Sequence, residues 1–387
     1  MRYQPILIAV AVATGGVLPA FLTGGLAVQI RDELGFGAGA LGLAVALFFG
    51  SSALASVVSG LFVERVGSHP GMRVAAVGSA ASLLAVAVFA GSWWGLVVCL
   101  VFGGFANAVS QLATNLSVAH EVPPGRQGLA FGIKQSAIPA ATLLAGLAVP
   151  GIALTLGWRW AFVGAAALVL FVAGLVPREE DDVRPREQVT NGGRAPTTPL
   201  VVLALGIGLG STAATPLGAF VVESAVASGI EVGAAGLLLA FGSAVGITVR
   251  VVLGHLVDSM QGGRLRLVSG MLGLGVVAFV LLATGTDVFV VAGTVLGYGA
   301  GWGWPGIFNF AIVKSNPGAP AAATGITQTG ASLGAAIGPL VFGLVVERAS
   351  YGAAWTTAGT LALLAALTIA VGRNLLVRER PAKSETG

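Results

Sequence analysis

Long apolar blocks recur from one end of this 387-residue chain to the other, and short strips between them carry most of the charged residues. A helix needs about 20 apolar residues to cross the hydrocarbon core of a bilayer. Cutting the chain at its charged or turn-rich strips gives twelve such blocks, and we predict a membrane-spanning helix in each. The blocks are 5–30, 38–63, 74–91, 94–118, 127–153, 159–177, 199–222, 232–257, 266–285, 288–312, 320–346 and 351–373.

The composition supports this assignment. Hydrophobic residues make up 56% of the chain and charged residues only 9%, whereas a soluble globular chain has about 25% charged residues. So few ionised groups cannot cover a surface that faces water, so we predict an all-α membrane protein in contact with the lipid bilayer. The net charge of +4 lies in strips between apolar blocks, so membrane topology explains it better than a nucleic-acid partner does.

The distribution of basic residues predicts the orientation in the membrane. If the amino terminus is inside, sixteen of the 20 Lys and Arg residues fall in inner segments and Lys134 falls within a span, while three, Arg31, Arg159 and Arg348, fall outside. Loops rich in Lys and Arg stay in the cytoplasm. We therefore expect a multi-pass protein of the cell inner (cytoplasmic) membrane with both termini in the cytoplasm.

The chain divides into two halves that resemble each other. The polar stretch 178–198 predicts a flexible cytoplasmic linker between a six-helix bundle at 1–177 and another at 199–387, which ends in a short cytoplasmic tail. A parallel repeat of this kind is typical of secondary transporters that rock two bundles about a central site. At a shift of about 194 residues the matching pairs are Glu64 with Asp258, Asn115 with Asn309 and, with one residue of slip, Gln135 with Gln328.

One motif resembles a signature of the major facilitator superfamily. The run from Gly60 through Glu64 and Arg65 to Gly67, followed by Arg73, is similar to that family's loop between helices 2 and 3, and Gly254 with Asp258 stands at the equivalent place in the second half. The resemblance covers essentially the whole chain, although Glu64 replaces the family's usual Asp and Ser259 its usual Arg. It implies twelve helices in two pseudo-symmetric six-helix bundles, a monomeric carrier, and a motif that holds the cytoplasmic side shut in the outward-open state. The motif does not identify the cargo.

Two cations are predicted deep within spans, where ionisable residues are costly and usually functional. Lys134 lies about seven residues into its block and Arg250 about seven residues before the end of its own. Because we place Glu223 and the other acids at helix ends or in loops, we expect both cations to be accessible, unpaired and facing one another, ready to bind an anion. Alternatively, Lys134 extends its ammonium toward the cytoplasm and Arg250 only joins the cytoplasmic gate. The resemblance adds that monocarboxylate and oxalate carriers of the superfamily use an Arg on helix 8, so we place the chain near the organic-anion, monocarboxylate or cyanate-type permease branches.

Polar and aromatic side chains at helical spacing complete the predicted substrate site. They repeat along one face of two blocks, at i, i+4 and i+8 in the first, and the resemblance implies that these helices line the transport cavity. Packing between helices, with hydrogen bonds across them, is the alternative for each. The candidates are Asn107, Gln111 and Asn115 on block 94–118, Tyr298, Trp302 and Asn309 on block 288–312, and the repeat mates Gln135 and Gln328.

Several function classes find no support in the sequence. There is no phosphate-binding loop for ATP, no nucleophile triad, and no metal-ligand pattern among the three His and one Cys, so we expect no metal, no cofactor and no enzyme activity. We predict a secondary active transporter that moves a small organic anion, a carboxylate, by alternating access, with a proton or a counter-anion as open choices of coupling partner. The alternatives are an efflux pump for apolar or cationic compounds and a membrane receptor or scaffold that transports nothing.

Overall fold

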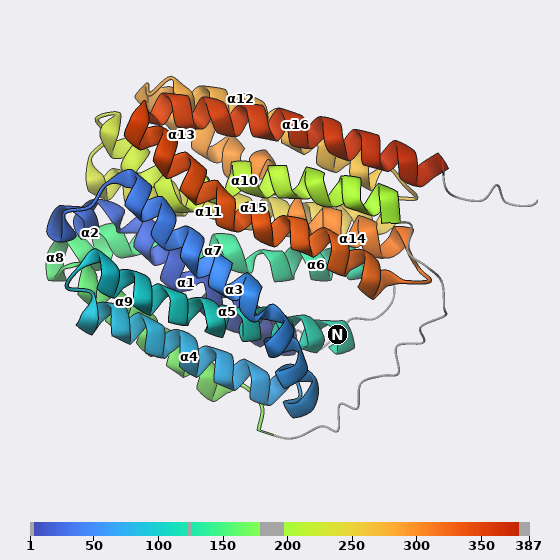
Figure 1. The fold of residues 1–387 in the computed structure, drawn as a ribbon, viewed down its shortest axis with the longest axis horizontal. Helices are drawn as coiled ribbons and strands as arrows, with labels where there is room; N and C mark the ends of the chain where they lie inside the picture. The colour runs from blue at the N-terminus through green and yellow to red at the C-terminus, as the bar shows by residue number, and fades with distance from the viewer. Residues whose placement is uncertain (1–3, 122–125, 179–196, 379–387) are drawn as a thin grey trace, which may run out of the picture.

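The computed structural model describes residues 4–121, 126–178 and 197–378, and within these ranges all regular structure is helical (Figure 1). Most of the predicted linker at 178–198 lies outside the described residues. The first group of helices is α1 (Gln4–Gly25), α2 (Ala27–Leu34), α3 (Ala38–Val66), α4 (Ser68–Phe89), α5 (Trp93–Glu121), α6 (Gln127–Gln135), α7 (Ala137–Ala148), the π-helix η1 (Val149–Ala153), α8 (Leu154–Leu156) and α9 (Trp158–Leu175). The second group is α10 (Thr197–Ala227), α11 (Val232–Ser259), α12 (Arg264–Ala283), α13 (Asp287–Leu296), the π-helix η2 (Gly297–Gly301), α14 (Pro305–Ser315), α15 (Pro320–Arg348) and α16 (Tyr351–Arg378).

Eleven helical segments of the described chain are long and apolar enough to cross a membrane. The predicted block 288–312 is the exception, because α13, η2 and α14 divide it into three short pieces. Five of the ten residues from Gly297 to Gly306 are glycines, and Pro305 cannot donate the backbone hydrogen bond that would continue the helix. The prediction of one continuous helix is therefore wrong for this block.

Other predicted boundaries shift for similar local reasons. Block 5–30 becomes α1 and α2, separated at Leu26, and block 127–153 is interrupted at Ser136, three residues before Pro139. At the carboxyl end of block 199–222 the helix continues to Ala227. The extension matters because it places Glu223 inside a helix.

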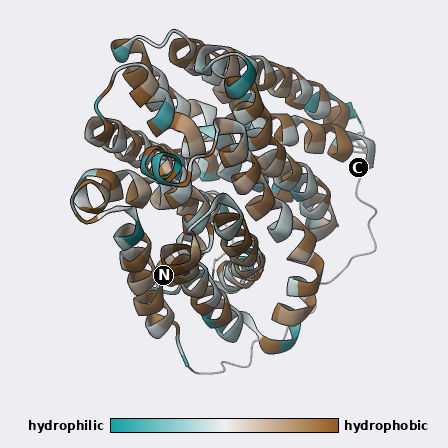
Figure 2. Cartoon of the chain, turned by 60° about the vertical axis from the view of Figure 1, so that its left-hand side comes forward, coloured by the Kyte–Doolittle hydropathy of each residue, from teal (hydrophilic) through white to brown (hydrophobic). Residues whose placement is uncertain are grey.

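The helices pack as two groups with a seam between them. Within the first group α4 packs against α5 and α9, and within the second α10 packs against α15 and α16. Across the seam α3 packs against α15, α6 and α7 pack against α11, and α1 packs against α10. Figure 1 shows α1 beginning and α16 ending at one end of the molecule, which we call the terminal end, and α2 and α8 at the opposite end, which we call the α2 end. Hydrophobic residues cover much of the outer length of the helices in Figure 2, as expected for a surface in lipid.

Along the seam, α3 and α15 are in closest contact near the α2 end. A Cβ at Gly42 would collide with the carbonyl oxygen of Pro339, so the two backbones touch there. Toward the terminal end the same two helices expose large apolar side chains, with Leu54 84% and Leu333 54% exposed. The close backbone contact between α3 and α15 thus lies near the α2 end.

Candidate functional site

Four polar side chains form a chain of hydrogen bonds that starts at Lys134. The Lys134 Nζ donates to Gln111 Oε1 at 2.8 Å, the Gln111 Nε2 donates to Asn107 Oδ1 at 3.4 Å, and the Asn107 Nδ2 donates to Ser52 Oγ at 2.9 Å. These residues come from α6, α5 and α3, all in the first group of helices. The structure therefore brings together three residues that the sequence predicted and adds Ser52, which it did not.

The ammonium group of Lys134 is bonded to a neutral amide, that of Gln111, and not to a carboxylate. Its side chain is half-buried, and the described residues offer it no ion pair, since the two ion pairs there involve Arg31 and Arg159. An ammonium group has three donor hydrogens, and the amide of Gln111 takes one of them. An anion would supply both a charge and acceptors for the others.

Arg250 is held by two backbone carbonyls at helix breaks, and a proline leaves the first of them free. One terminal nitrogen donates to the carbonyl oxygen of Gln135 at the break between α6 and α7, and the other donates to that of Trp302 at the break before α14. Within a helix the carbonyl of Gln135 would accept from residue 139, but this residue is Pro139 and has no N–H. Trp302 lies in the short gap between η2 and α14, so its carbonyl is outside both helices. The guanidinium thus joins two broken helices on opposite sides of the seam.

This geometry corrects the expectation that Arg250 is accessible and unpaired. Arg250 is 2% exposed, and its Cζ lies 5.8 Å from the ring centroid of Trp302. Only its Nε has no hydrogen-bond partner in the described structure. The physical reason is the cost of burying a charge, which carbonyl oxygens reduce when no carboxylate is present.

Aromatic side chains from both groups of helices meet next to Arg250. The ring of Trp302 lies 5.7 Å from that of Phe21 on α1 and 5.8 Å from that of Tyr298, and Phe21 lies 5.9 Å from Phe49 on α3. Trp302 and Tyr298 are buried, and the Tyr298 hydroxyl donates to the carbonyl of Leu217 on α10 at 3.4 Å. We call Phe21, Phe49, Tyr298 and Trp302 the seam aromatics.

The remaining predicted side chains do not join the Lys134 chain. Asn309 is buried, whereas Asn115 and Gln328 are exposed. None of these three makes a side-chain hydrogen bond within the described residues. Gln135 is half-buried and contributes its backbone carbonyl to Arg250 rather than its amide. Of the three polar residues on this face of α5, Gln111 accepts from Lys134 and Asn107 accepts from Gln111, whereas Asn115 takes no part.

The second copy of the superfamily motif, Gly254 with Asp258, contacts the first group of helices. The Asp258 carboxylate at the end of α11 accepts from the backbone N–H groups of Gly128 at 2.7 Å and Leu129 at 3.0 Å, in the first turn of α6. Unpaired N–H groups and the helix dipole make this position attractive to a negative charge. The small residues Gly254 and Gly132 allow the backbones of α11 and α6 to approach each other.

The first copy makes no equivalent contact. Glu64 and Arg65 are exposed and have no partner within the described chain. Gly67 adopts a positive φ of 86° at the tight turn from α3 to α4, and Gly60 has only Leu112 near its Cβ position. Arg73 donates to the backbone carbonyls of Val176 and Pro177 at the end of α9. Helix α6 is thus joined to α11 at the terminal end, whereas α3 is not joined to α15 there.

At the α2 end an ion pair crosses the seam. Arg31 on α2 pairs with Glu223 on α10, and the Tyr351 hydroxyl donates to the other Glu223 carboxylate oxygen at 3.2 Å. Glu223 is 4% exposed and lies within α10. The expectation that it lies at a helix end or in a loop is therefore corrected. No local pattern signals this pair, because its members are 192 residues apart.

The acidic, His and Cys side chains of the described residues do not gather at one place. No group of three or more His, Cys, Asp or Glu side chains among the described residues could hold a metal ion. The side chains of Lys134, Gln111 and Asn107 can bind a ligand by ionic and hydrogen-bonding contacts. The seam aromatics can provide apolar contacts.

The arrangement of the helices is one that solved structures of other proteins share. It matches solved structures of a bacterial homologue of the human lysosomal transporter Spinster in inward-facing occupied and inward-facing unoccupied forms, each with a TM-score of 0.76, 15% sequence identity and 99% of this chain covered. The matches cover 99% and 100% of those chains. At this identity the likeness shows the fold.

The sequence comparisons identify the family. The model of the Major Facilitator Superfamily matches residues 6–311, so the chain belongs to this superfamily. A chloramphenicol resistance protein of Streptomyces lividans is 28% identical, with 97% of each chain covered. An uncharacterized MFS-type transporter of Mycobacterium tuberculosis is 27% identical over 79% of this chain and 71% of its own. The chain is therefore a superfamily transporter with apolar membrane-spanning helices, as the motif at Gly60–Gly67 predicted.

Proposed function

We propose that this transporter moves a small organic anion, a carboxylate, across the cytoplasmic membrane by alternating access, and that Lys134 supplies the positive charge that binds it. The observation that carries the proposal is the bond from Lys134 to the neutral amide of Gln111, in a region where the described residues offer the ammonium no carboxylate. A charge held at this depth without a counter-charge favours a ligand that brings one. Gln111 and Asn107 then serve as hydrogen-bonding neighbours of the anion.

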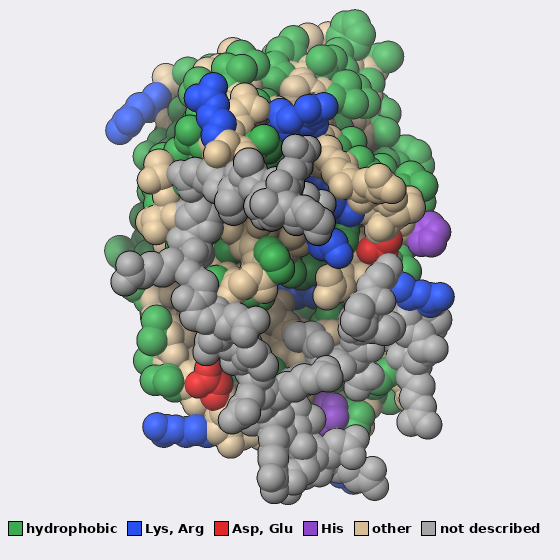
Figure 3. Space-filling view, turned by 90° about the vertical axis from the view of Figure 1, so that its right-hand side faces the viewer, with side chains coloured by type: hydrophobic (Ala, Val, Ile, Leu, Met, Phe, Trp, Pro, Cys, Tyr) green, Lys and Arg blue, Asp and Glu red, His purple; other side chains and the backbone are tan. Residues whose placement is uncertain are grey.

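The two groups of helices act in this proposal as the two bundles that rock, and the broken segment from α13 to α14 acts as the twelfth membrane crossing. The terminal end faces the cytoplasm, consistent with the Lys and Arg side chains that outnumber Asp and Glu there in Figure 3. The seam contacts differ between ends: Arg31 pairs with Glu223 at the α2 end, whereas at the terminal end Asp258 joins α11 to α6 but Glu64 has no partner among the described residues. This asymmetry supports an inward-facing state, and we propose that the carrier acts as a monomer.

Arg250 has a different role in this proposal from Lys134. Its two terminal nitrogens are already bound to carbonyls on both sides of the seam, so it holds the helix breaks in place, and an anion would have to compete with those bonds. Lys134 is therefore the residue whose positive charge is free to bind an anionic substrate.

A second candidate function is the export of uncharged aromatic compounds. The relative named as a chloramphenicol resistance protein covers nearly the whole chain, and the seam aromatics offer flat apolar surfaces where the two groups of helices meet. Aromatic faces of this kind bind flat apolar ligands. In this alternative Lys134 would contribute little to binding.

Flux into proteoliposomes decides between these functions. Purified protein is reconstituted and tested with radiolabelled acetate, lactate and oxalate, and separately with chloramphenicol, using Lys134→Ala and, as a matched control, Lys314→Ala, which removes an exposed lysine of α14. We expect flux of at least one carboxylate that falls at least about tenfold in K134A and persists in K314A. Chloramphenicol flux that K134A leaves unchanged would overturn the anion proposal, and no flux of any compound would favour a receptor.

A further inference from the structure

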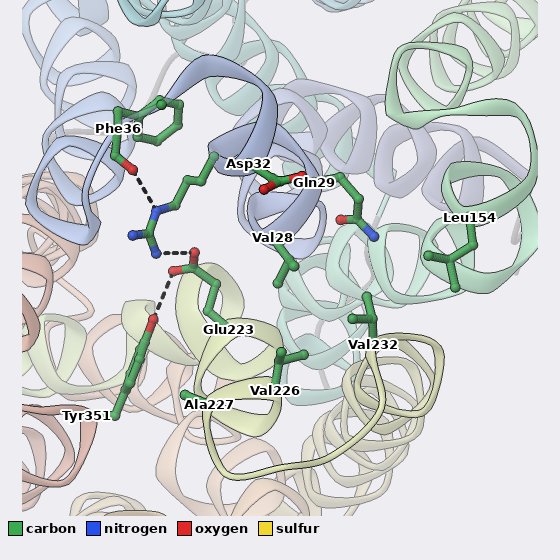
Figure 4. A pocket seen from close by; sticks show the side chains of 12 residues that line it. Val28, Gln29, Asp32, Phe36, Leu154, Glu223, Val226, Ala227, Val232 and Tyr351 are labelled. Atoms are coloured by element: carbon green, nitrogen blue, oxygen red, sulfur yellow. Dashed lines mark hydrogen bonds and ion pairs between the residues drawn. The ribbon is translucent and has the colours of Figure 1, made fainter.

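A cavity of about 590 Å³ lies at the α2 end, apart from the Lys134 chain. Its volume is within the range of small-molecule sites, roughly 300–1,000 Å³. One wall is α2 of the first group of helices, and the other comes from α10, α11 and α16 of the second group, as Figure 4 shows. The cavity therefore spans the seam that must open for the α2 end to become accessible.

The cavity is lined by one cationic and two acidic side chains, so one carboxylate has no cationic partner in the lining. Arg31 and Glu223 neutralise each other, and Arg31 also donates its Nε to the carbonyl of Phe36 at 2.9 Å. Asp32 also lines the cavity and is exposed, and the described residues give it no hydrogen bond or ion pair. The net charge of the lining is thus negative, which favours a cation.

One amide in the lining has no partner. Both polar atoms of the Gln29 side chain are shielded from solvent and make no hydrogen bond within the described structure. An amide has two donor hydrogens and an acceptor oxygen, and leaving such a group buried and unsatisfied costs about 1–3 kcal/mol. Gln29 precedes Asp32 by three residues, so both project from one face of α2, and Figure 4 shows them next to each other.

The other side of the cavity is apolar. Leu154, Val226 and Val232 face the same space and are drawn in Figure 4 on elements other than α2. A ligand that suits both sides carries a compact positive head with N–H donors for Asp32, and an apolar body for these side chains.

From this geometry we infer that the cavity at the α2 end is a second binding site, which takes a small organic cation of the amidinium or primary-ammonium class. Such a ligand contacts both groups of helices, so it binds the form in which the α2 end is closed. The inference does not depend on the carboxylate proposed for Lys134.

Calorimetric titration of the purified full-length protein tests the site, with benzamidine as the cationic probe and benzamide as its neutral isostere. We expect benzamidine to bind at millimolar concentration or below and benzamide to bind at least about tenfold more weakly. Asp32→Asn should weaken benzamidine binding at least about tenfold. Since Asp32 is exposed and has no partner among the described residues, the Asn variant should fold as the parent does.

Two further variants make the test specific. Asp287→Asn removes an exposed carboxylate from the start of α13, outside the cavity lining, and should leave benzamidine affinity unchanged. Lys134→Ala should also leave it unchanged, which separates this site from the proposed cargo site. The inference is overturned if benzamidine does not bind, if D32N binds it as tightly as the parent protein does, if benzamide binds equally well, or if K134A abolishes binding.

Discussion

The guanidinium of Arg250 donates to the backbone carbonyl of Gln135, the carbonyl that would accept from residue 139 if Pro139 had an N–H. Its other terminal nitrogen donates to the backbone carbonyl of Trp302, three residues before Pro305. One side chain of α11 therefore satisfies the acceptors at helix breaks in both groups of helices. Breaks of this kind are tolerated in membrane proteins where another group takes over the lost hydrogen bond.

Replacing Arg250 by Ala should lower the stability of the folded protein by on the order of 3 kcal/mol, because two charge-assisted hydrogen bonds are lost and two buried carbonyls remain unsatisfied. The measurement is thermal unfolding of the purified protein in detergent. Arg250→Lys should restore only part of the loss, because one ammonium cannot reproduce the fork geometry of a guanidinium.

A double-mutant cycle with Pro139→Ala isolates the proposed cause. The alanine of this variant can donate its N–H to the Gln135 carbonyl, so the cost of R250A should be smaller in the P139A background than in the parent. Equal costs in the two backgrounds would show that the free carbonyl of Gln135 is not the reason for the position of Arg250.

The bond between Lys134 and Gln111 leads to a second prediction. Gln111→Glu places a carboxylate within reach of the ammonium, so the pair becomes an internal salt bridge and the positive charge is no longer free for an anionic substrate. Carboxylate flux in proteoliposomes should fall at least about tenfold. Asn115→Asp is the matched control, since Asn115 lies on the same helix but is exposed. If Q111E transported carboxylates as well as the parent does, Lys134 could not be the anion-binding charge.

The two copies of the gate motif should respond differently to neutralisation. Asp258 accepts two backbone N–H bonds from the first turn of α6, so Asp258→Asn should destabilise the protein by about 1 kcal/mol. Glu64→Gln should change stability by less than about 0.5 kcal/mol, because Glu64 is exposed and has no partner among the described residues. Melting temperatures of the two variants in the same detergent provide the comparison, and equal shifts would contradict the asymmetry.

The sequence predicted the parts of this molecule that depend on local pattern. The apolar blocks became helices because a lipid surface requires side chains of that kind along the whole helix. The sequence motif singled out Asp258, and this carboxylate accepts from the first turn of a neighbouring helix. The break near Trp302 was missed, although Gly-rich sequence followed by Pro305 signals an interrupted helix.

What the sequence could not predict depends on which helices meet. Ser52 and Asn107 are 55 residues apart and Arg31 and Glu223 are 192 apart, so neither pairing has a local signature. Arg250 was expected to be a free cation because no acid was expected near it. Its actual partners are backbone carbonyls, which every residue has and which become available only where a proline or a helix break frees them.

A final prediction concerns acid pH at the α2 end, where Glu33 on α2 accepts hydrogen bonds from Arg159 and Trp158 of α9. Burial opposes ionisation of Glu33, but these bonds and the Arg159 charge outweigh it and hold its pKa below the ordinary 4.5. A carboxyl with a lowered pKa stabilises the folded protein above its ordinary pKa and loses this contribution as the pH falls through the folded value. The parent protein should therefore melt above Glu33→Gln at neutral pH, and the two melting temperatures should converge below about pH 4.5. A difference that stayed constant down to about pH 3 would mean that ionisation of Glu33 does not hold α2 against α9.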